Sequence, residues 1–425
     1  MLNYRKETLK NGVRIVTEGI PHVRSVSLGL WVRAGSRDED KSNSGISHFI
    51  EHMMFKGTQN RTAREIAESL EAVGGQLNAF TAKEYTCYYV RVLDEHLDLA
   101  IDVLSDMFFN SRFALPDIDT ERKVVLEEIN MYEDSPDELI HDLFARTIWK
   151  DHSLGEPILG SLETIKALNR EALLDYLHRH YTPDRLVIAA AGHLDHDSLV
   201  DRLRVHFEDW PGIEFPPVKN TEAPQHHAAV VWQKKDTEQI HLCLGVPGLQ
   251  QKDDRLYTLN VLNNILGGGV SSRLFQEIRE QRGLAYSVFS YHSAYRDSGI
   301  LGVYAGTGPA NVEQVIELLL KEIKQIRKQG VYKHELQRTQ DQIKGGVYLG
   351  LESVSNRMTR LGKSELCYNR IIDPDEVIQK VQAIQPEEIQ QLAEEIFAPE
   401  KLVAVSIGPG EQSVDLQRWI NGNIR

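Results

Sequence analysis

Two histidines and a glutamate in the segment 47–57 are the side chains of this chain best suited to chemistry. His48 and His52 are four residues apart, and Glu51 directly precedes the second histidine. On a helix, residues at i and i+4 lie on one face, and Glu51, at i+3 from His48, reaches the same side. Two imidazoles beside a carboxylate can bind a zinc ion and hold a base next to its water molecule. The spacing therefore predicts a hydrolytic metal centre.

The order of these residues and their neighbours favours such a centre over an exposed helix face. His-x-x-Glu-His is the reverse of the commoner His-Glu-x-x-His and is typical of inverted zinc peptidases. The alternative is an ordinary surface helix with two exposed histidines and a solvated glutamate. Five flanking residues are apolar and predict a buried helix: Phe49, Ile50, Met53, Met54 and Phe55. Buried histidines and a buried carboxylate need partners, and a metal ion supplies one to all three.

A third protein ligand is expected, because catalytic zinc is held by three side chains and keeps a fourth position for water. The predicted helix at 119–129 offers Glu121, Glu127 and Glu128. Glu121 and Glu128 are about two turns apart and share a face, whereas Glu127 points ~100° away from Glu128. A glutamate-rich helix is usually a charged surface. Spacing alone leaves Glu127 and Glu128 both open as the ligand.

Several segments resemble the pitrilysin-type zinc peptidases, the clan of the mitochondrial processing peptidase, and within it the single-chain bacterial members of this length. They occur in the expected order along most of the chain: residues 45–58, 76–81, 121–128, 266–275 and 279–286. The resemblance implies that Glu128 is the third zinc ligand and that Glu121 orients a histidine. It leaves Glu127 in solvent. Glu51 is then the general base that takes a proton from the metal-activated water.

The resemblance also implies residues that contact the substrate. Arg279 and Tyr286 correspond to an Arg-Tyr pair that reaches the substrate carbonyl, where they would stabilise the oxyanion of amide hydrolysis. From the sequence alone, a helix-end arginine and a core tyrosine are the better interpretation. Asn78 and Ala79 lie in a predicted edge strand, to which an extended peptide can add through backbone hydrogen bonds. A plain strand asparagine near a turn is the alternative there.

Length and pattern predict two related domains. The chain has 425 residues, too many for a single core. A proline cluster marks residues 210–227 as a linker, and residues 240–246 after it resemble residues 26–32 before it. We predict an α+β protein of two homologous α/β-sandwich halves of about 200 residues. Residues 1–209 would be the catalytic zinc-binding half, and residues 228–425 a metal-free half that contacts the substrate.

The family resemblance implies that the two halves face each other across a cleft. Because His-x-x-Glu-His occurs only in the first half, we expect one Zn²⁺ per chain. The resemblance further implies a homodimer.

Composition and charge narrow the partners and the compartment. The formal net charge of −14 disfavours nucleic acid and anionic membranes as partners. The three cysteines, Cys87, Cys243 and Cys367, have no paired spacing, which favours a reducing compartment. We see neither a signal sequence nor an apolar run long enough to span a bilayer, and therefore expect a cytoplasmic protein.

The sequence thus predicts a zinc endopeptidase acting on peptides or unfolded segments bound in extended form. Two alternatives stay open: a non-catalytic or scaffolding subunit of the same fold, and a zinc hydrolase of small molecules. The complete ligand set argues against the first alternative. The predicted peptide-binding strand and the Arg-Tyr pair argue against the second.

Overall fold

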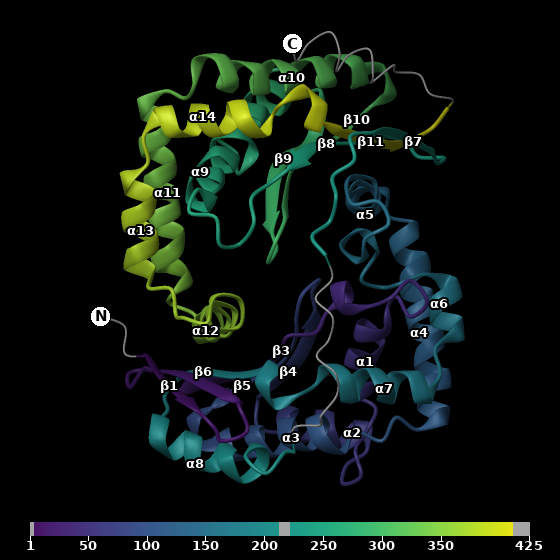
Figure 1. Ribbon diagram of the computed structural model, residues 1–425, viewed down its shortest axis with the longest axis vertical. Coiled ribbons are helices and arrows are strands. Elements are labelled where there is room, and N and C mark those ends of the chain that lie inside the picture. Colours follow the sequence, from purple (N-terminus) through teal and green to yellow (C-terminus); the bar gives the residue numbers. More distant parts are fainter. Residues whose placement is uncertain (1–3, 212–221, 411–425) are drawn as a thin grey trace. The chain divides into compact units, whose positions relative to one another are not determined.

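The computed structural model describes residues 4–211 and 222–410, and Figure 1 shows the helices and strands that they form. The chain divides into two compact units, each discontinuous along the sequence. The first unit comprises the described residues of 1–130, 156–221 and 348–373. The second unit comprises the described residues of 131–155, 222–347 and 374–425. Residues 212–221 of the predicted linker lie outside the described residues.

The first unit is built on a six-stranded sheet in the order β1-β2-β6-β3-β5-β4. Its strands are β1 (Tyr4–Thr8), β2 (Arg14–Gly19), β3 (Ser25–Val32), β4 (Gln76–Thr81), β5 (Thr86–Leu93) and β6 (Leu186–Gly192). β2 and β6 pair in parallel, and all other neighbours pair antiparallel. β6 is buried along its whole length, as its apolar run predicts. β4 forms one edge of the sheet.

The second unit repeats this topology in a five-stranded sheet of order β7-β11-β8-β10-β9. Its strands are β7 (Val230–Lys234), β8 (Ile240–Pro247), β9 (Ala285–Ala294), β10 (Gly299–Thr307) and β11 (Val403–Gly408). β11 and β7 are parallel, as β6 and β2 are in the first unit, and the other pairs are antiparallel. In both sheets the last strand of the half lies between the first two strands of the shared pattern. The predicted pair of related α+β halves is confirmed.

Helices cover both sheets. The first unit contains α1 (Ile46–Met54), α2 (Ala63–Glu71), α3 (Leu97–Asn110), α4 (Leu115–Glu133, whose last residues belong to the second unit), α6 (Leu162–Ala167), α7 (Arg170–His180), α8 (His196–Phe207) and α12 (Val354–Tyr368). The second unit contains α5 (Pro136–Ile148), α9 (Leu256–Gly267), α10 (Val312–Gln329), α11 (Lys333–Gly350, whose last residues belong to the first unit), α13 (Pro374–Ala383) and α14 (Pro386–Ile396). Among the described residues, no helix has both the length and the apolar character needed to cross a bilayer.

Two helices each pack on the sheet formed by the other half of the sequence. α12 comes from the sequence after the linker, but it packs on β2, β3 and β6 of the first sheet, on the face opposite α3 and α8 (Figure 1). α5 comes from the sequence before the linker and packs on β8 and β11 of the second sheet. The predicted halves, 1–209 and 228–425, therefore differ from the compact units by the segments that carry these helices.

The packing of α12 and α5 on these sheets follows from the apolar character of both faces of each sheet. Each sheet is apolar on both faces, and a second apolar face must be covered. In the first sheet, the side chain of Trp31 is fully buried against α12, where Gly362 leaves room for the indole ring. In the second sheet, Phe144 of α5 packs at Gly245 in the same way.

Buried ion pairs hold α12 on the first sheet. Glu18 of β2 is 1% exposed and pairs with Arg357 and Arg360 of the helix. Glu365 of the helix is fully buried and pairs with Lys6 (2.7 Å) and with an arginine of β2. A buried charge that loses its partner is strongly destabilising, so these reciprocal pairs specify which sheet the helix covers.

Candidate metal centre

Helix α1 carries the His-x-x-Glu-His motif, and a glycine and a buried glutamate hold its first turn. Gly45, just before the helix, has a φ of 93°, in the left-handed region that glycine tolerates. A Cβ there would lie 2.7 Å from the backbone oxygen of Leu159. The Glu39 carboxylate accepts hydrogen bonds from the backbone N–H groups of Gly45 (2.7 Å) and Ser47 (2.9 Å). It therefore satisfies N–H groups that a helix start leaves free.

The rest of α1 is anchored in the core. Five apolar side chains of the helix are at most 1% exposed: Ile46, Phe49, Ile50, Met53 and Met54. Phe55, at the end of the helix, is partly buried against the same core. The predicted buried helix is confirmed, and the burial fixes the direction in which the two histidines point.

Three ligand atoms converge beside this helix. The Nε2 atoms of His48 and His52 are 3.2 Å apart. Oε2 of Glu128, on α4, lies 3.9 Å from Nε2 of His48 and 3.7 Å from Nε2 of His52. Two nitrogens bound to one zinc ion at ~2.1 Å in tetrahedral geometry lie about 3.4 Å apart. Two imidazoles and one carboxylate at these separations fit the donor set of a catalytic zinc site.

Glu121 and Lys56 orient the second histidine. Nδ1–H of His52 donates to Oε1 of Glu121 at 2.7 Å, and Nζ of Lys56 lies 2.5 Å from Oε2 of the same carboxylate. Burial raises the pKa of Glu121, but the hydrogen bonds from His52 and Lys56 outweigh it and keep the pKa below the ordinary value. The charged carboxylate holds the proton on Nδ1, which leaves Nε2 free to bind a metal.

His48 is held in the neutral form that a metal ligand requires. Its burial, together with the nearby charge of His52, lowers its pKa to about 3. Its Nδ1 atom is buried without a hydrogen-bond partner among the described residues. With its proton on Nδ1, the neutral ring would present the lone pair of Nε2 beside the His52 ring.

Glu51 lies next to the ligands without joining them. Its Oε2 atom accepts a hydrogen bond of 2.5 Å from the hydroxyl of Thr81, the last residue of β4. Burial raises the pKa of Glu51, and the hydrogen bond from Thr81 and the charge of His52 offset only part of this rise. A carboxylate with a raised pKa and one fixed oxygen is suited to accept and return a proton.

The structure separates the two adjacent glutamates that spacing left open. Glu128 is half-buried beside both rings, whereas Glu127 is exposed and accepts a hydrogen bond from Asn130. Among residues 4–211 and 222–410, a single group of His, Cys, Asp or Glu side chains has its ligand atoms close enough together to hold a metal ion. This group is His48, His52 and Glu128, whose ligand atoms lie within 4.8 Å of one another.

Comparison with known proteins identifies the family of this chain. The model of the insulinase family, peptidase family M16, matches residues 14–162, and the model described as the peptidase M16 inactive domain matches residues 167–343. A Bacillus subtilis protein named uncharacterized zinc protease YmxG is 47% identical over 403 residues, covering 94% of this chain and 97% of that protein. This chain belongs to peptidase family M16.

A further relative is similar along most of this chain, and a solved structure shares its fold. An uncharacterized zinc protease of Streptomyces coelicolor is 43% identical and covers 95% of this chain and 89% of that protein. The crystal structure of a protease from Helicobacter pylori has a TM-score of 0.90 at 22% identity and covers 96% of this chain and 100% of that one. This second similarity shows the fold. The predicted resemblance to the pitrilysin-type peptidases is confirmed.

Asn78 and Ala79 lie in an edge strand, and their contact with substrate stays a prediction. Both belong to β4, whose only partner among the described strands is β5. Asn78 is exposed, and its Oδ1 atom accepts a hydrogen bond of 2.8 Å from the N–H of Ala79. Thr81 of the same strand contacts Glu51, so the free edge of the sheet runs beside the metal helix.

Arg279 and Tyr286 come together in the second unit. The Arg279 guanidinium lies over the Tyr286 ring at 4.7 Å from its centroid, and over the Phe275 ring at the same distance. Tyr286 is 77% exposed, so the alternative interpretation of this residue as a core tyrosine is wrong. Gly283 makes the turn between them with a φ of 63°. The side chains stack as a pair, and their role toward the substrate stays a prediction.

Three residues that shape the centre were not singled out from the sequence. Lys56 and Thr81 lie inside the segments that carry the family resemblance, and only their contacts reveal their roles. Glu39 lies in a polar stretch before α1 that reads as a loop. A glutamate six residues before the glycine that starts a helix carries no local capping signal.

Proposed function

We propose that this chain is a zinc-dependent endopeptidase that hydrolyses peptides or unfolded segments bound in extended form. The observation that carries the proposal is the convergence of two imidazole nitrogens and a carboxylate beside a separate, half-buried glutamate. Relatives that are 47% and 43% identical over most of the chain are named zinc proteases, which supports the metal and the reaction class.

The residues divide into those that hold the metal and those that move protons. His48, His52 and Glu128 would hold one Zn²⁺, which when bound supplies the Lewis acidity that activates water and polarises a peptide carbonyl. Glu51 accepts a proton from the attacking water and delivers it to the nitrogen of the leaving amine. Thr81 fixes one oxygen of Glu51. Glu121 keeps the His52 ring in the orientation that its role demands.

Substrate contacts follow from the edge strand. A peptide that adds to β4 through backbone hydrogen bonds at Asn78 and Ala79 would be bound in extended form with little dependence on its side chains. We further assign Arg279 and Tyr286 to the oxyanion, because an exposed phenol stacked under a guanidinium offers two donors to a developing negative charge.

The Tyr286→Phe variant tests this assignment to the oxyanion. We expect kcat to fall by roughly 100-fold while KM changes little, because the lost donor acts mainly in the transition state. Steady-state kinetics on a fluorogenic peptide measures both constants, and Tyr4→Phe, an exposed tyrosine of β1, is the control. Unchanged kcat in Tyr286→Phe would remove Tyr286 from the reaction.

The proposal as a whole is tested with a mixed peptide library. Mass spectrometry should find internal cleavages with the protein, none after treatment with a zinc chelator, and recovery when Zn²⁺ is returned. A protein that binds zinc and cleaves no peptide would instead be a scaffolding subunit or a hydrolase of small molecules.

We propose that the protein works in the cytoplasm as a homodimer. Analytical ultracentrifugation of the full chain tests whether it is a dimer.

A further inference from the structure

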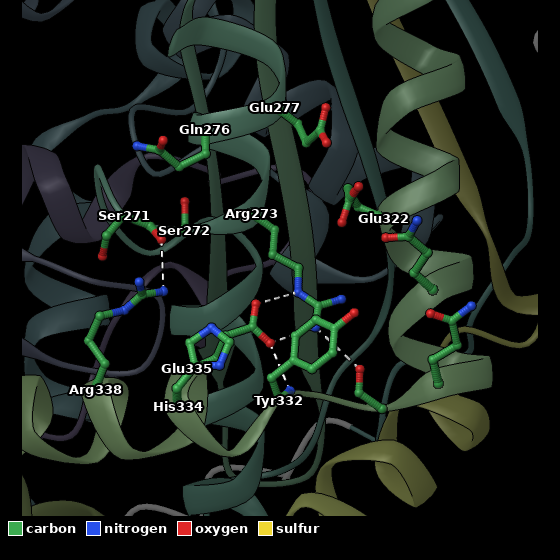
Figure 2. Close-up of a pocket in the computed structure, with 13 residues that line it drawn as sticks. Ser271, Ser272, Arg273, Gln276, Glu277, Glu322, Tyr332, His334, Glu335 and Arg338 are labelled. Carbon is green, nitrogen blue, oxygen red and sulfur yellow. Dashed lines mark hydrogen bonds and ion pairs between the residues drawn. The ribbon is translucent and has the colours of Figure 1, made fainter. Parts of the chain in front are cut away.

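The second unit contains a polar pocket that the metal centre does not use. It encloses about 320 Å³ and lies among the segment after α9, α10 and the start of α11 (Figure 2). Glu277 and Gln276, from the π-helical segment Phe275–Glu280, line one side of it, Glu322 of α10 another, and Glu335 of α11 a third. Its size is within the range of sites that bind small molecules.

Both arginines that line the pocket are already engaged. Arg273 donates to both carboxylate oxygens of Glu335, at 2.8 and 2.7 Å, and Figure 2 shows its guanidinium directed at that residue. The backbone N–H of Tyr332 also donates to Glu335. Arg338 donates to the backbone oxygen of Ser271 at 2.9 Å. The guanidinium groups of both arginines are therefore engaged in hydrogen bonds within the protein.

Of the three carboxylates that line the pocket, only Glu322 is left without an ion pair to a described residue. Glu277 pairs with Arg282. Glu322 is only 3% exposed and lines the pocket, yet it makes neither a hydrogen bond nor an ion pair with any described residue. Oγ of Ser272, a residue that is 2% exposed, is also buried without a partner there. A largely buried carboxylate that faces a pocket without a protein partner is stabilised by a positively charged ligand.

The electrostatic surroundings of Glu322 favour a positive group beside it. Burial raises the pKa of Glu322, and the nearby charges of Glu277 and Glu335 raise it further, against the lowering effect of Arg273. A positive group placed beside Glu322 would stabilise its charged form. Within the described residues, the pocket's carboxylates do not form a group close enough to hold a metal ion, so an organic cation fits better.

We propose that this pocket binds an organic cation with N–H donors, an ammonium group, with Glu322 as its counter-ion and the Ser272 hydroxyl as a further acceptor. Such a group occurs on a free small amine and on a basic side chain of a peptide. The shared chemistry is a compact positive charge with several donors, matched to a buried carboxylate.

Calorimetric titration of the full-length protein tests the site with three probes. Cadaverine represents a free amine, N-acetyl-lysine methylamide a peptide side chain, and N-acetyl-norleucine methylamide its uncharged counterpart. We expect one or both cationic probes to bind and the norleucine probe not to bind. Binding of the lysine probe alone identifies a peptide as the source of the cation, and comparable binding of cadaverine identifies a free amine.

Variants locate the binding. Glu322→Gln should lower the affinity of the cationic probe at least about tenfold, whereas Glu317→Gln, an exposed glutamate on the same helix, should leave it unchanged. Ser272→Ala should weaken binding about threefold to tenfold, which provides a second variant should the first not fold. A chelator should not alter binding, which separates this site from the metal centre. No binding by either cation, or equal binding by Glu322→Gln, would overturn the proposal.

Discussion

Glu51 has the contacts and the burial expected of a base that exchanges protons with water and substrate. One oxygen is held by Thr81 and the other is not committed to the metal ligands. The Glu51→Gln variant should retain zinc and lose activity by about 100-fold or more, because the amide cannot accept a proton. Elemental analysis gives the zinc content and a fluorogenic peptide gives kcat.

The exposed Glu68, on α2, is the control for that experiment, and Glu68→Gln should behave as the wild type. If Glu51→Gln kept a tenth or more of the wild-type kcat, another residue would have to be the base.

The adjacent pair Glu127 and Glu128 offers a second test at single-residue resolution. Glu128→Gln replaces a charged ligand by a weakly coordinating amide and should lower zinc affinity at least about 100-fold. Glu127→Gln removes the same charge one position away and should leave the affinity unchanged. Competition with a chromogenic chelator measures both. Equal losses in the two variants would point to a general effect of charge instead of coordination.

Helix α1 depends on a residue outside it. Glu39 accepts two backbone hydrogen bonds at the start of the helix while fully buried. Burial is the largest effect on this carboxyl and raises its pKa from 4.5 to about 7, although the hydrogen bonds from Gly45 and Ser47 act in the opposite direction. The folded protein therefore holds this proton more tightly than the unfolded chain does.

A dependence of stability on pH follows from this difference. The contribution of Glu39 is fully present below pH 4.5 and is lost as the pH rises through about 7. The loss amounts to about 3 kcal/mol in the free energy of unfolding. In Glu39→Gln this component should vanish, which urea unfolding across the same pH range measures. The exposed variant Glu71→Gln is the control, and a wild-type pH profile in Glu39→Gln would contradict the assignment.

At the scale of the whole molecule, the exchanged helices tie the two halves of the sequence together. The first sheet obtains one of its covers from α12 and the second sheet obtains one from α5. A fragment of residues 1–209 therefore lacks the helix that buries Trp31 and the two charged residues that pair with Glu18. The corresponding fragment 228–425 lacks α5, whose Phe144 packs at Gly245.

Expression of the two fragments tests this dependence. Each fragment alone should aggregate or bind a hydrophobic dye, since an uncovered apolar sheet face remains. Co-expression should restore a folded complex, because each fragment brings the helix that the other lacks. Size-exclusion chromatography and dye fluorescence distinguish these states. A fragment 1–209 that unfolds cooperatively as a monomer would contradict the argument.

Local patterns in the sequence were sufficient for the metal helix and for the repeated α+β architecture. The apolar residues around His48 predict burial of α1, and β6 and β11 are both recognisable as apolar runs. Such features depend on side chains within a few residues of one another, so periodicity reports them directly. The distant carboxylate was reduced to two adjacent candidates by the same reasoning.

What residue spacing and periodicity could not decide, and the tertiary structure did, concerns partners that are far apart along the chain. It placed Glu128 beside the imidazoles and Glu127 in solvent, exposed Tyr286, and put Glu39 at the start of α1. It also exchanged α5 and α12 between the sheets. Hydrophobic periodicity indicates that one face of a helix or sheet must be buried, but it does not indicate which segment of the chain covers that face. That choice is made by shape and charge, which exist only after the chain has folded.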